Sequence, residues 1–291
     1  MMLDAIPRPR TVAAFALIVI LGMPTARAVR AQDVSAWEEQ PHAAVRLIAG
    51  TALKSDPALL RAGIEIRLDP GWKTYWRYPG DSGVPPTFDF AGSANVKTVT
   101  VKWPAPERFA DGAGGHSIGY VGDVVFPLRI ARQDAAEGAS LHVKLGYAIC
   151  GKLCIPAEAD LILGLSGKAR AEEPALAAAQ ARVPRRIPLG ASSGLAITAV
   201  HRERSGAHER VVVDVAAPAK MPIELFVEGP TADWALPLPE PIGPASGVAA
   251  DVRRFSFDLD GLPGGAHAEG ASLTFTAVSP DDAIEVETHL D

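Results

Sequence analysis

The sequence predicts an all-β protein of two β-sandwich domains joined by a short Ala-rich helical linker. Short strand-like segments recur between proline and glycine residues, which number 25 and 27. Apolar and polar residues alternate in Ile64–Leu68 and Val99–Trp103, as they do in strands with one buried face. About 260 of the 291 residues follow the N-terminal 31, and that length is typical of two domains.

Residues 1–31 are typical of a secretory signal peptide. Two arginines precede the apolar run Thr11–Met23, and small residues offer cleavage sites near Ala28 or Ala31. The run is too short to span a bilayer comfortably, so we expect an exported protein without stable membrane insertion. The signal peptide carries four arginines and one aspartate, which leaves the mature chain a net charge of −9 against −6 for the whole chain. This charge argues against nucleic acid as a partner.

The first predicted sandwich covers residues 38–168. Its strands are expected at His42–Ala49, Gly63–Leu68, Trp72–Arg77, Val96–Trp103, Val124–Ala131, Leu141–Ile149 and Leu153–Leu165. Many short strands at this spacing favour a sandwich over other all-β folds. Trp72, Tyr75, Trp76 and Tyr78 form a dense aromatic cluster, for which we predict a packing role.

The composition then changes over residues 169–190, the predicted linker. Ala169–Ala181 is rich in Ala and Glu, which predicts a helix that begins near Pro174 and ends before Val183. The second sandwich, residues 191–291, contains no cysteine. Its strands are expected at Leu195–His201, Arg210–Ala216, Ile223–Glu228, Val252–Leu259, Leu273–Val278 and Ile284–Leu290.

Both cysteines of the chain, Cys150 and Cys154, lie in the stretch Gly146–Ala159. Apolar, β-prone residues run into and out of this stretch, which predicts a β-hairpin with a tight Gly-Lys-Leu turn between the thiols. Facing positions of an antiparallel pair lie within disulfide range, so we expect the two cysteines to be bridged.

The role of such a bridge is open at this point. Closing a loop of about five residues stabilises a fold by only about 2 kcal/mol, which favours a redox pair over a structural staple. The C-x-x-x-C spacing and the lack of a βαβ pattern do not fit a thioredoxin-type motif. A two-thiolate Cu(I) site at the same pair is a further alternative, because soft thiolates select that ion. The seven histidines show no metal-ligand spacing, so we predict no resident metal and no cofactor.

Gly115–Gly119 matches the G-x-S-x-G pattern of a hydrolase nucleophile elbow. That motif needs a strand before it and a helix after it. Here glycines precede it and the strand-like segment starting at Gly122 follows, so we interpret it as a flexible loop.

The stretches Tyr147–Ala159 and Gly71–Gly83 together resemble the N-terminal periplasmic (alpha) domain of the DsbD/ScsB thiol:disulfide interchange family. The resemblance implies an immunoglobulin-like sandwich in the periplasm, a component of a protein-disulfide reductase. Its cysteine pair would pass electrons from a membrane-embedded thiol reductase to periplasmic thioredoxin-fold proteins. It also implies that Cys154 forms the intermolecular bond and that Cys150 resolves it. The alternative is a periplasmic copper-handling or protein-binding module with a structural disulfide.

The chain departs from the family in two ways. The cysteine spacing is narrower than in the enterobacterial DsbD domain, which points to the ScsB branch. The chain has neither the transmembrane helices nor the thioredoxin domain of the full reductases, so we expect a separate membrane protein to reduce the pair.

In the DsbD domain, a mobile cap loop with an aromatic residue shields the cysteines. The predicted loop Phe109–Tyr120 lies at a similar place in this chain without the family's cap motif, so Phe109 and Tyr120 are the cap candidates, with ordinary core packing as the alternative. Tyr147 and Pro156 are the neighbouring candidates, because they flank the cysteines within the motif.

Overall fold

The computed structural model describes residues 33–111, 114–192, 194–205, 208–218, 220–243 and 251–291. The predicted signal peptide lies outside these residues. Nowhere in the described ranges does a helix reach the length and hydrophobicity that crossing a bilayer requires.

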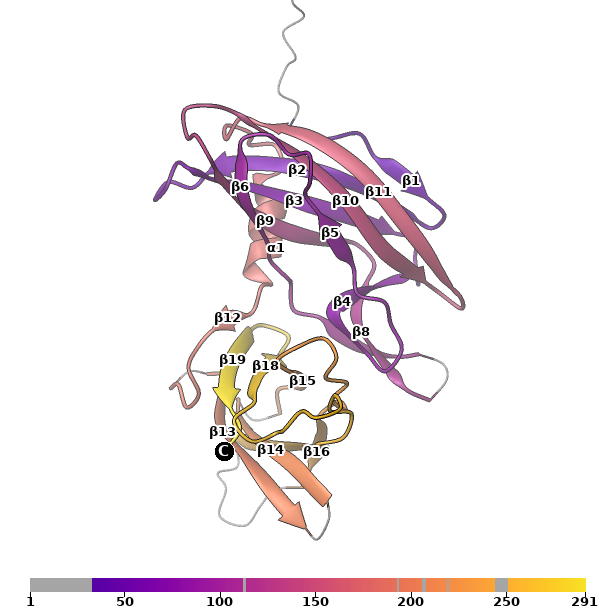
Figure 1. Cartoon of the computed structure of the whole chain (residues 1–291), viewed down its shortest axis with the longest axis vertical. Helices are drawn as coiled ribbons and strands as arrows, with labels where there is room; N and C mark the ends of the chain where they lie inside the picture. The colour runs from indigo at the N-terminus through magenta and orange to yellow at the C-terminus, as the bar shows by residue number, and fades with distance from the viewer. Residues whose placement is uncertain (1–32, 112–113, 193, 206–207, 219, 244–250) are drawn as a thin grey trace, which may run out of the picture. The chain divides into compact units, whose positions relative to one another are not determined.

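Two antiparallel sheets form the first sandwich (Figure 1). One sheet has the order β1 (Glu38–Gln40), β2 (Ala43–Ala52), β3 (Leu59–Leu68), β9 (Val124–Arg132) and β6 (Val96–Val101). The other has the order β11 (Cys154–Leu165), β10 (Ala139–Cys150), β4 (Lys73–Gly80), β8 (His116–Val121) and β7 (Glu107–Ala110), with β5 (Thr87–Asp89) paired to β10. The second sheet therefore carries both cysteines.

Two four-stranded sheets follow in the C-terminal part of the chain. One has the order β12 (Arg185–Arg186), β19 (Ala283–His289), β18 (Ser272–Val278) and β15 (Glu224–Glu228). The other has the order β13 (Ala196–Ser205), β14 (His208–Ala216), β17 (Val252–Asp258) and β16 (Glu240–Ile242). The all-β class with immunoglobulin-like sandwiches is thus confirmed, whereas the domain boundaries at residues 168 and 190 stay a prediction.

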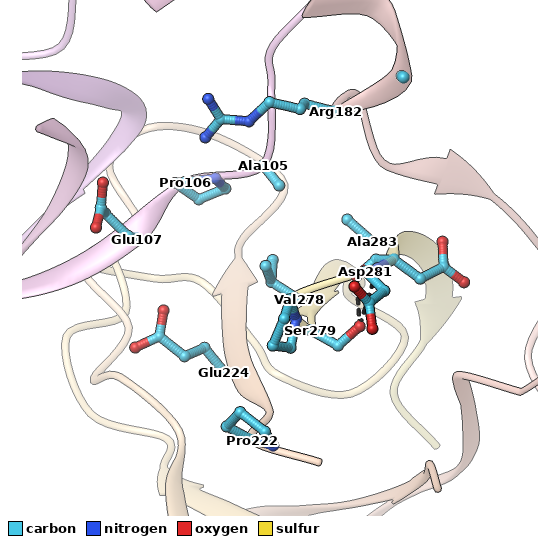
Figure 2. Close-up of a pocket in the computed structure, with 13 residues that line it drawn as sticks. Ala105, Pro106, Glu107, Arg182, Pro222, Glu224, Val278, Ser279, Asp281 and Ala283 are labelled. Carbon is cyan, nitrogen blue, oxygen red and sulfur yellow. Dashed lines mark hydrogen bonds between the residues drawn. The ribbon is translucent and has the colours of Figure 1, made fainter. Parts of the chain in front are cut away.

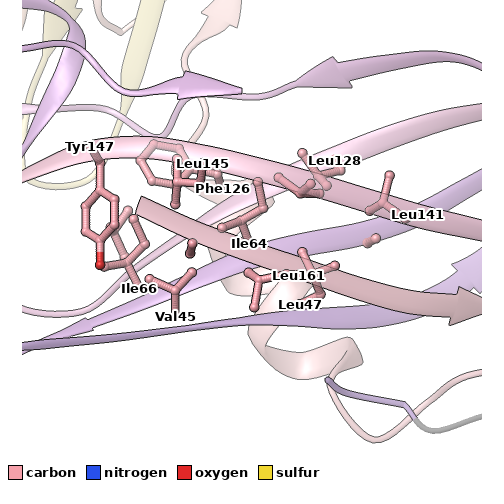
Figure 3. Close-up of a cluster of buried hydrophobic side chains, with 14 of the residues drawn as sticks. Val45, Leu47, Ile64, Ile66, Phe126, Leu128, Leu141, Leu145, Tyr147 and Leu161 are labelled. Carbon is pink, nitrogen blue, oxygen red and sulfur yellow. The ribbon is translucent and has the colours of Figure 1, made fainter. Parts of the chain in front are cut away.

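The strands bury alternate side chains, and this alternation builds the first core. In β11, every second residue from Ala157 to Leu165 is buried while its neighbours are exposed. Figure 3 shows Val45 and Ile66 from one sheet facing Leu145 and Tyr147 from the other. Burying apolar side chains from both sheets in this way is the main stabilising contribution to the sandwich.

The helix α1 (Glu173–Ala181), which we predicted as part of a linker, packs onto the first sandwich. Leu176 is buried, and its two methyl groups would lie 2.7 Å from a Cβ at Gly50 and 2.9 Å from a Cβ at Gly63. The Glu173 carboxylate accepts a hydrogen bond from the Thr51 N–H at 2.5 Å and pairs with Arg61. β2 is consequently buried on both faces over much of its length, whereas on the outward face of β3 only Gly63, beneath Leu176, is buried.

The predicted loop Phe109–Tyr120 was the main error in the predicted fold. Its described residues form the antiparallel hairpin of β7 and β8, in which Phe109 faces Ser117 and Glu107 faces Gly119. Ser117 is buried within a strand, and the next described element is the strand β9 rather than a helix, so the nucleophile-elbow pattern has no counterpart in the described residues.

Candidate functional site

The two cysteines close a β-hairpin, as predicted. Cys150 ends β10, Cys154 begins β11, and the two residues face each other in the register. They form a disulfide with a Cα–Cα distance of 4.1 Å. The turn between them, Gly151–Leu153, is closed by a hydrogen bond from the Gly151 N–H to the Leu153 carbonyl at 3.0 Å.

The two sulfur-bearing residues differ strongly in exposure. Cys150 is 3% exposed, because its strand end also pairs with Lys73 of β4. Cys154 is exposed, because β11 is the edge strand of its sheet, and the neighbouring Leu153 is 78% exposed. An attacking thiolate therefore meets the sulfur of Cys154 before that of Cys150.

Tyr75 on β4 contacts both sulfur atoms. Its hydroxyl donates a hydrogen bond to Cys150 Sγ at 2.9 Å and lies 3.2 Å from Cys154 Sγ. Burial raises the pKa of Tyr75, a hydrogen bond with Ser117 lowers it, and the charge of Asp111 raises it, with a net increase above the usual value. The phenol consequently keeps its proton and remains a donor throughout the physiological pH range.

Phe109 on β7 lies beside the same group. Its ring packs against the small buried cluster of Tyr75, Ala148 and Cys150, with 6.4 Å between the Phe109 and Tyr75 ring centroids. The Lys73 ammonium lies 4.2 Å from the Phe109 ring centroid, within cation–π range. The structure thus places this cap candidate near the disulfide.

The second cap candidate, Tyr120, lies in the first core. It is 3% exposed, its hydroxyl donates to the Pro104 carbonyl at 3.0 Å, and its ring packs edge-on against Phe126. Burial raises the pKa of its phenol well above the usual value. Tyr120 therefore has the core-packing role that was its alternative.

Strand geometry separates the two neighbouring candidates. Successive residues along a strand point to opposite faces. Tyr147 is three positions before Cys150, so it points into the core, away from the disulfide. Pro156, two positions after Cys154, faces Ala148 and lies on the same face as the sulfurs. Of these two residues, Pro156 is the one on the face of the sheet that carries the disulfide.

Sequence reasoning assigned Tyr75 only a packing role and so missed its contact with the sulfurs. One signal was available: a tyrosine rather than a phenylalanine at a buried strand position carries a hydroxyl that needs a partner. That signal indicates a polar partner but does not identify it.

We expect Tyr75→Phe to slow reduction of the disulfide by dithiothreitol about tenfold. When Cys154 is attacked, Cys150 leaves as a thiolate, and a hydrogen bond to a charged group contributes about 1.5 kcal/mol or more. Stopped-flow or quenched thiol assays give the rate. Tyr147→Phe is the matched control, because its buried hydroxyl has no hydrogen-bond partner among the described residues. Equal rates for Tyr75→Phe and the wild type would rule out this contribution.

A separate pocket of about 370 Å³ is shown in Figure 2. Glu107, Arg182, Glu224 and the segment 278–283 contribute to its lining, and neither cysteine does. The pKa of Glu224 is raised above its usual value by burial, although the Arg108 backbone N–H and the Arg108 charge act to lower it. Thiol–disulfide exchange therefore does not take place in this pocket, because no cysteine lines it. Within the described ranges, no group of three or more His, Cys, Asp or Glu residues could hold a metal ion.

The chain is similar in sequence to one protein family and in structure to a solved periplasmic domain. The model of the family described as "Thiol:disulfide interchange protein DsbD, N-terminal" matches residues 45–166. The crystal structure of the N-terminal periplasmic domain of ScsB from Proteus mirabilis is similar, with a TM-score of 0.68 and 25% identity over 89% of this chain and 98% of that chain. A conserved domain protein from Bacillus anthracis has a TM-score of only 0.20 at 9% identity, over 83% of this chain and 75% of that chain, which is too low to indicate a common fold.

No curated protein matches the chain. The family match covers β3 to β11 completely and most of β2, and so includes both cysteines and Tyr75. The likeness to the ScsB domain extends beyond it into the second sandwich, since it covers 89% of the chain. Residues 45–166 therefore form a domain of the DsbD N-terminal family, a thiol:disulfide interchange domain related to the periplasmic domain of ScsB.

Proposed function

We propose that this chain is a periplasmic electron relay that works by thiol–disulfide exchange at Cys150 and Cys154. Its electron donor is a membrane-embedded thiol reductase, and its acceptors are periplasmic thioredoxin-fold proteins. The observation that carries the proposal is the unequal exposure of the two cysteines in a disulfide that belongs to an interchange domain. A passive staple needs neither an exposed sulfur nor a hydrogen-bond donor aimed at the buried one.

The reduction half consumes one dithiol. A thiolate of the donor attacks Cys154 Sγ, the Cys150–Cys154 bond breaks, and Cys150 leaves as a thiolate that Tyr75 is placed to stabilise. The second thiolate of the donor then attacks the donor sulfur of the mixed disulfide and releases Cys154. Two electrons have moved to this chain, and the donor is left with a disulfide.

The oxidation half runs in the opposite direction. The Cys154 thiolate attacks the acceptor disulfide, one acceptor sulfur leaves as a thiolate, and a mixed disulfide forms. Cys150 then attacks Cys154 Sγ and releases the second acceptor thiolate, which restores the intramolecular bond. The buried Cys150 is suited to this second step, because it lies within bonding distance of Cys154 and is shielded from other disulfides.

Trapping in the periplasm tests the proposal. We expect Cys150→Ser, which leaves the exposed Cys154 free, to accumulate a mixed disulfide with a membrane protein on non-reducing gels. The reciprocal Cys154→Ser variant keeps only the buried thiol and should trap far less. The same trapped bands from both variants would contradict the assigned roles.

Equilibration in redox buffers gives a second measurement. A potential below about −300 mV is typical of structural disulfides, so such a value would favour a passive bridge. If nothing is trapped and the reduced protein binds Cu(I) tightly through both thiolates, the copper-handling alternative replaces the relay.

A further inference from the structure

The two strands that bring aromatic side chains to the disulfide also carry contacts to the second sandwich. β4 holds Tyr75, and within three residues of it lie Arg77 and Tyr78. β7 holds Phe109, preceded directly by Arg108. Each of these three neighbours makes a hydrogen bond to a residue beyond 220.

On β4, the contacts are extensive and partly buried. The Arg77 guanidinium donates to both carboxylate oxygens of Glu228 at 2.7 and 2.6 Å and to Glu285 at 2.6 Å. The Tyr78 hydroxyl donates to the Leu236 carbonyl at 2.7 Å. Directly before Arg77 on β4, the fully buried Trp76 packs against Phe226, with 5.9 Å between ring centroids. A bidentate arginine–carboxylate pair fixes orientation as well as distance.

On β7, Arg108 bonds to three residues of the second sandwich. Its backbone N–H donates to Glu224 at 3.3 Å, and its guanidinium donates to the Glu240 carboxylate at 2.6 Å and the Pro239 carbonyl at 3.0 Å. Glu224 belongs to β15 and Glu240 to β16, which lie in different sheets. Because β7 is a four-residue edge strand and β8 is its one partner among the described strands, these bonds supply much of what fixes its position.

We propose that the second sandwich braces the disulfide site, with Arg77 and Arg108 as positioning residues that hold Tyr75 and Phe109 against the sulfurs. Neither arginine touches a sulfur; each acts through the aromatic residue on its own strand. This inference rests on the proposed function only in that it makes the disulfide the reacting group. It gives the cysteine-free sandwich a role in setting how readily the disulfide reacts.

The test measures reduction of the wild-type disulfide by excess dithiothreitol and compares it with three variants. Phe109→Ala removes the side chain that covers the Cys150 side and should speed reduction several-fold. Arg108→Ala should also speed it, because β7 is freed to move. If Arg108 acts through Phe109, the double variant will be no faster than Phe109→Ala alone, since coupled residues give non-additive effects.

Two further variants keep the test decisive. Glu240→Gln weakens the Arg108 bond at an exposed carboxylate, and a smaller increase in rate is expected even if Arg108→Ala folds poorly. Arg254→Ala breaks another arginine–carboxylate ion pair, Arg254–Asp214, which lies wholly within the second sandwich, and should leave the rate unchanged. The unfolding midpoint of each variant is recorded beside its rate.

Three results would overturn the brace: wild-type rates for Arg108→Ala and Glu240→Gln, multiplication of the single effects in the double variant, or an equal increase for Arg254→Ala. No increase for Phe109→Ala would do the same. Dithiothreitol needs no protein partner, so the brace can fail while trapping succeeds, and trapping can fail while the brace is upheld.

Discussion

Replacing both Cys150 and Cys154 by serine is expected to abolish thiol–disulfide exchange completely while leaving the fold intact. The bridge closes a loop of about five residues, and the chain-entropy model assigns such a loop about 2 kcal/mol. The hairpin is already held by the register of β10 and β11, which runs from Ala139 facing Leu165 to the cysteines. Urea unfolding and an exchange assay with a reduced dithiol measure the two effects separately.

Leu153→Ser is the matched control for this variant, because it alters the exposed tip of the same turn and keeps the disulfide. It should retain exchange with dithiothreitol. A loss near 5 kcal/mol in the double serine variant, the upper end for native structural bridges, would assign the disulfide to stability instead.

Gly119→Ala is expected to lower the free energy of unfolding by about 3 kcal/mol, the upper end of the range for overpacking. A Cβ at this position would lie 2.0 Å from the Thr74 carbonyl oxygen and 2.9 Å from Tyr75 Cα, and both are backbone atoms that cannot rotate away. Relief requires β8 to separate from β4 where Gly119 faces Tyr75. The same shift would displace the Tyr75 hydroxyl from the sulfurs, so slower reduction should accompany the loss of stability.

Gly164→Ala provides the comparison. Gly164 is also a strand glycine, but it is exposed and a Cβ there would meet no atom within 4 Å. Its substitution should be neutral or stabilise the protein by about 0.4–1 kcal/mol. Similar stabilities for Gly119→Ala and Gly164→Ala would show that the close approach of β4 and β8 is not required.

Local patterns predicted most of the long strands, including β2, which is buried on both faces, but they failed at β8. β11 alternates between buried and exposed residues and was found readily. In β8, Ser117, Ile118 and Gly119 are all buried, because Ser117 bonds to the Ser82 carbonyl and Gly119 lies against the backbone of β4. A small polar residue and a glycine give no apolar alternation, so this segment resembles a loop in sequence.

The disulfide could be predicted because it depends on a turn of three residues. The contact of Tyr75 with Cys150 depends on how β4 meets β10, and the two residues are 75 positions apart. Proximity in sequence was also misleading for Tyr147, which is close to Cys150 along the chain but an odd number of residues away, and so on the opposite face. What remained unpredictable was therefore the pairing of distant strands.

The seating of α1 on the first sandwich has a consequence for how this chain can diverge. A Cβ at Gly50 would lie 2.7 Å from a Leu176 methyl, and one at Gly63 would lie 2.9 Å from the other. A side chain at either glycine requires the Leu176 side chain to turn away or become smaller, or the helix to move. The residues tolerated at positions 50 and 63 therefore depend on the residue at position 176. A relative with a larger residue at 50 or 63 should differ at 176 as well.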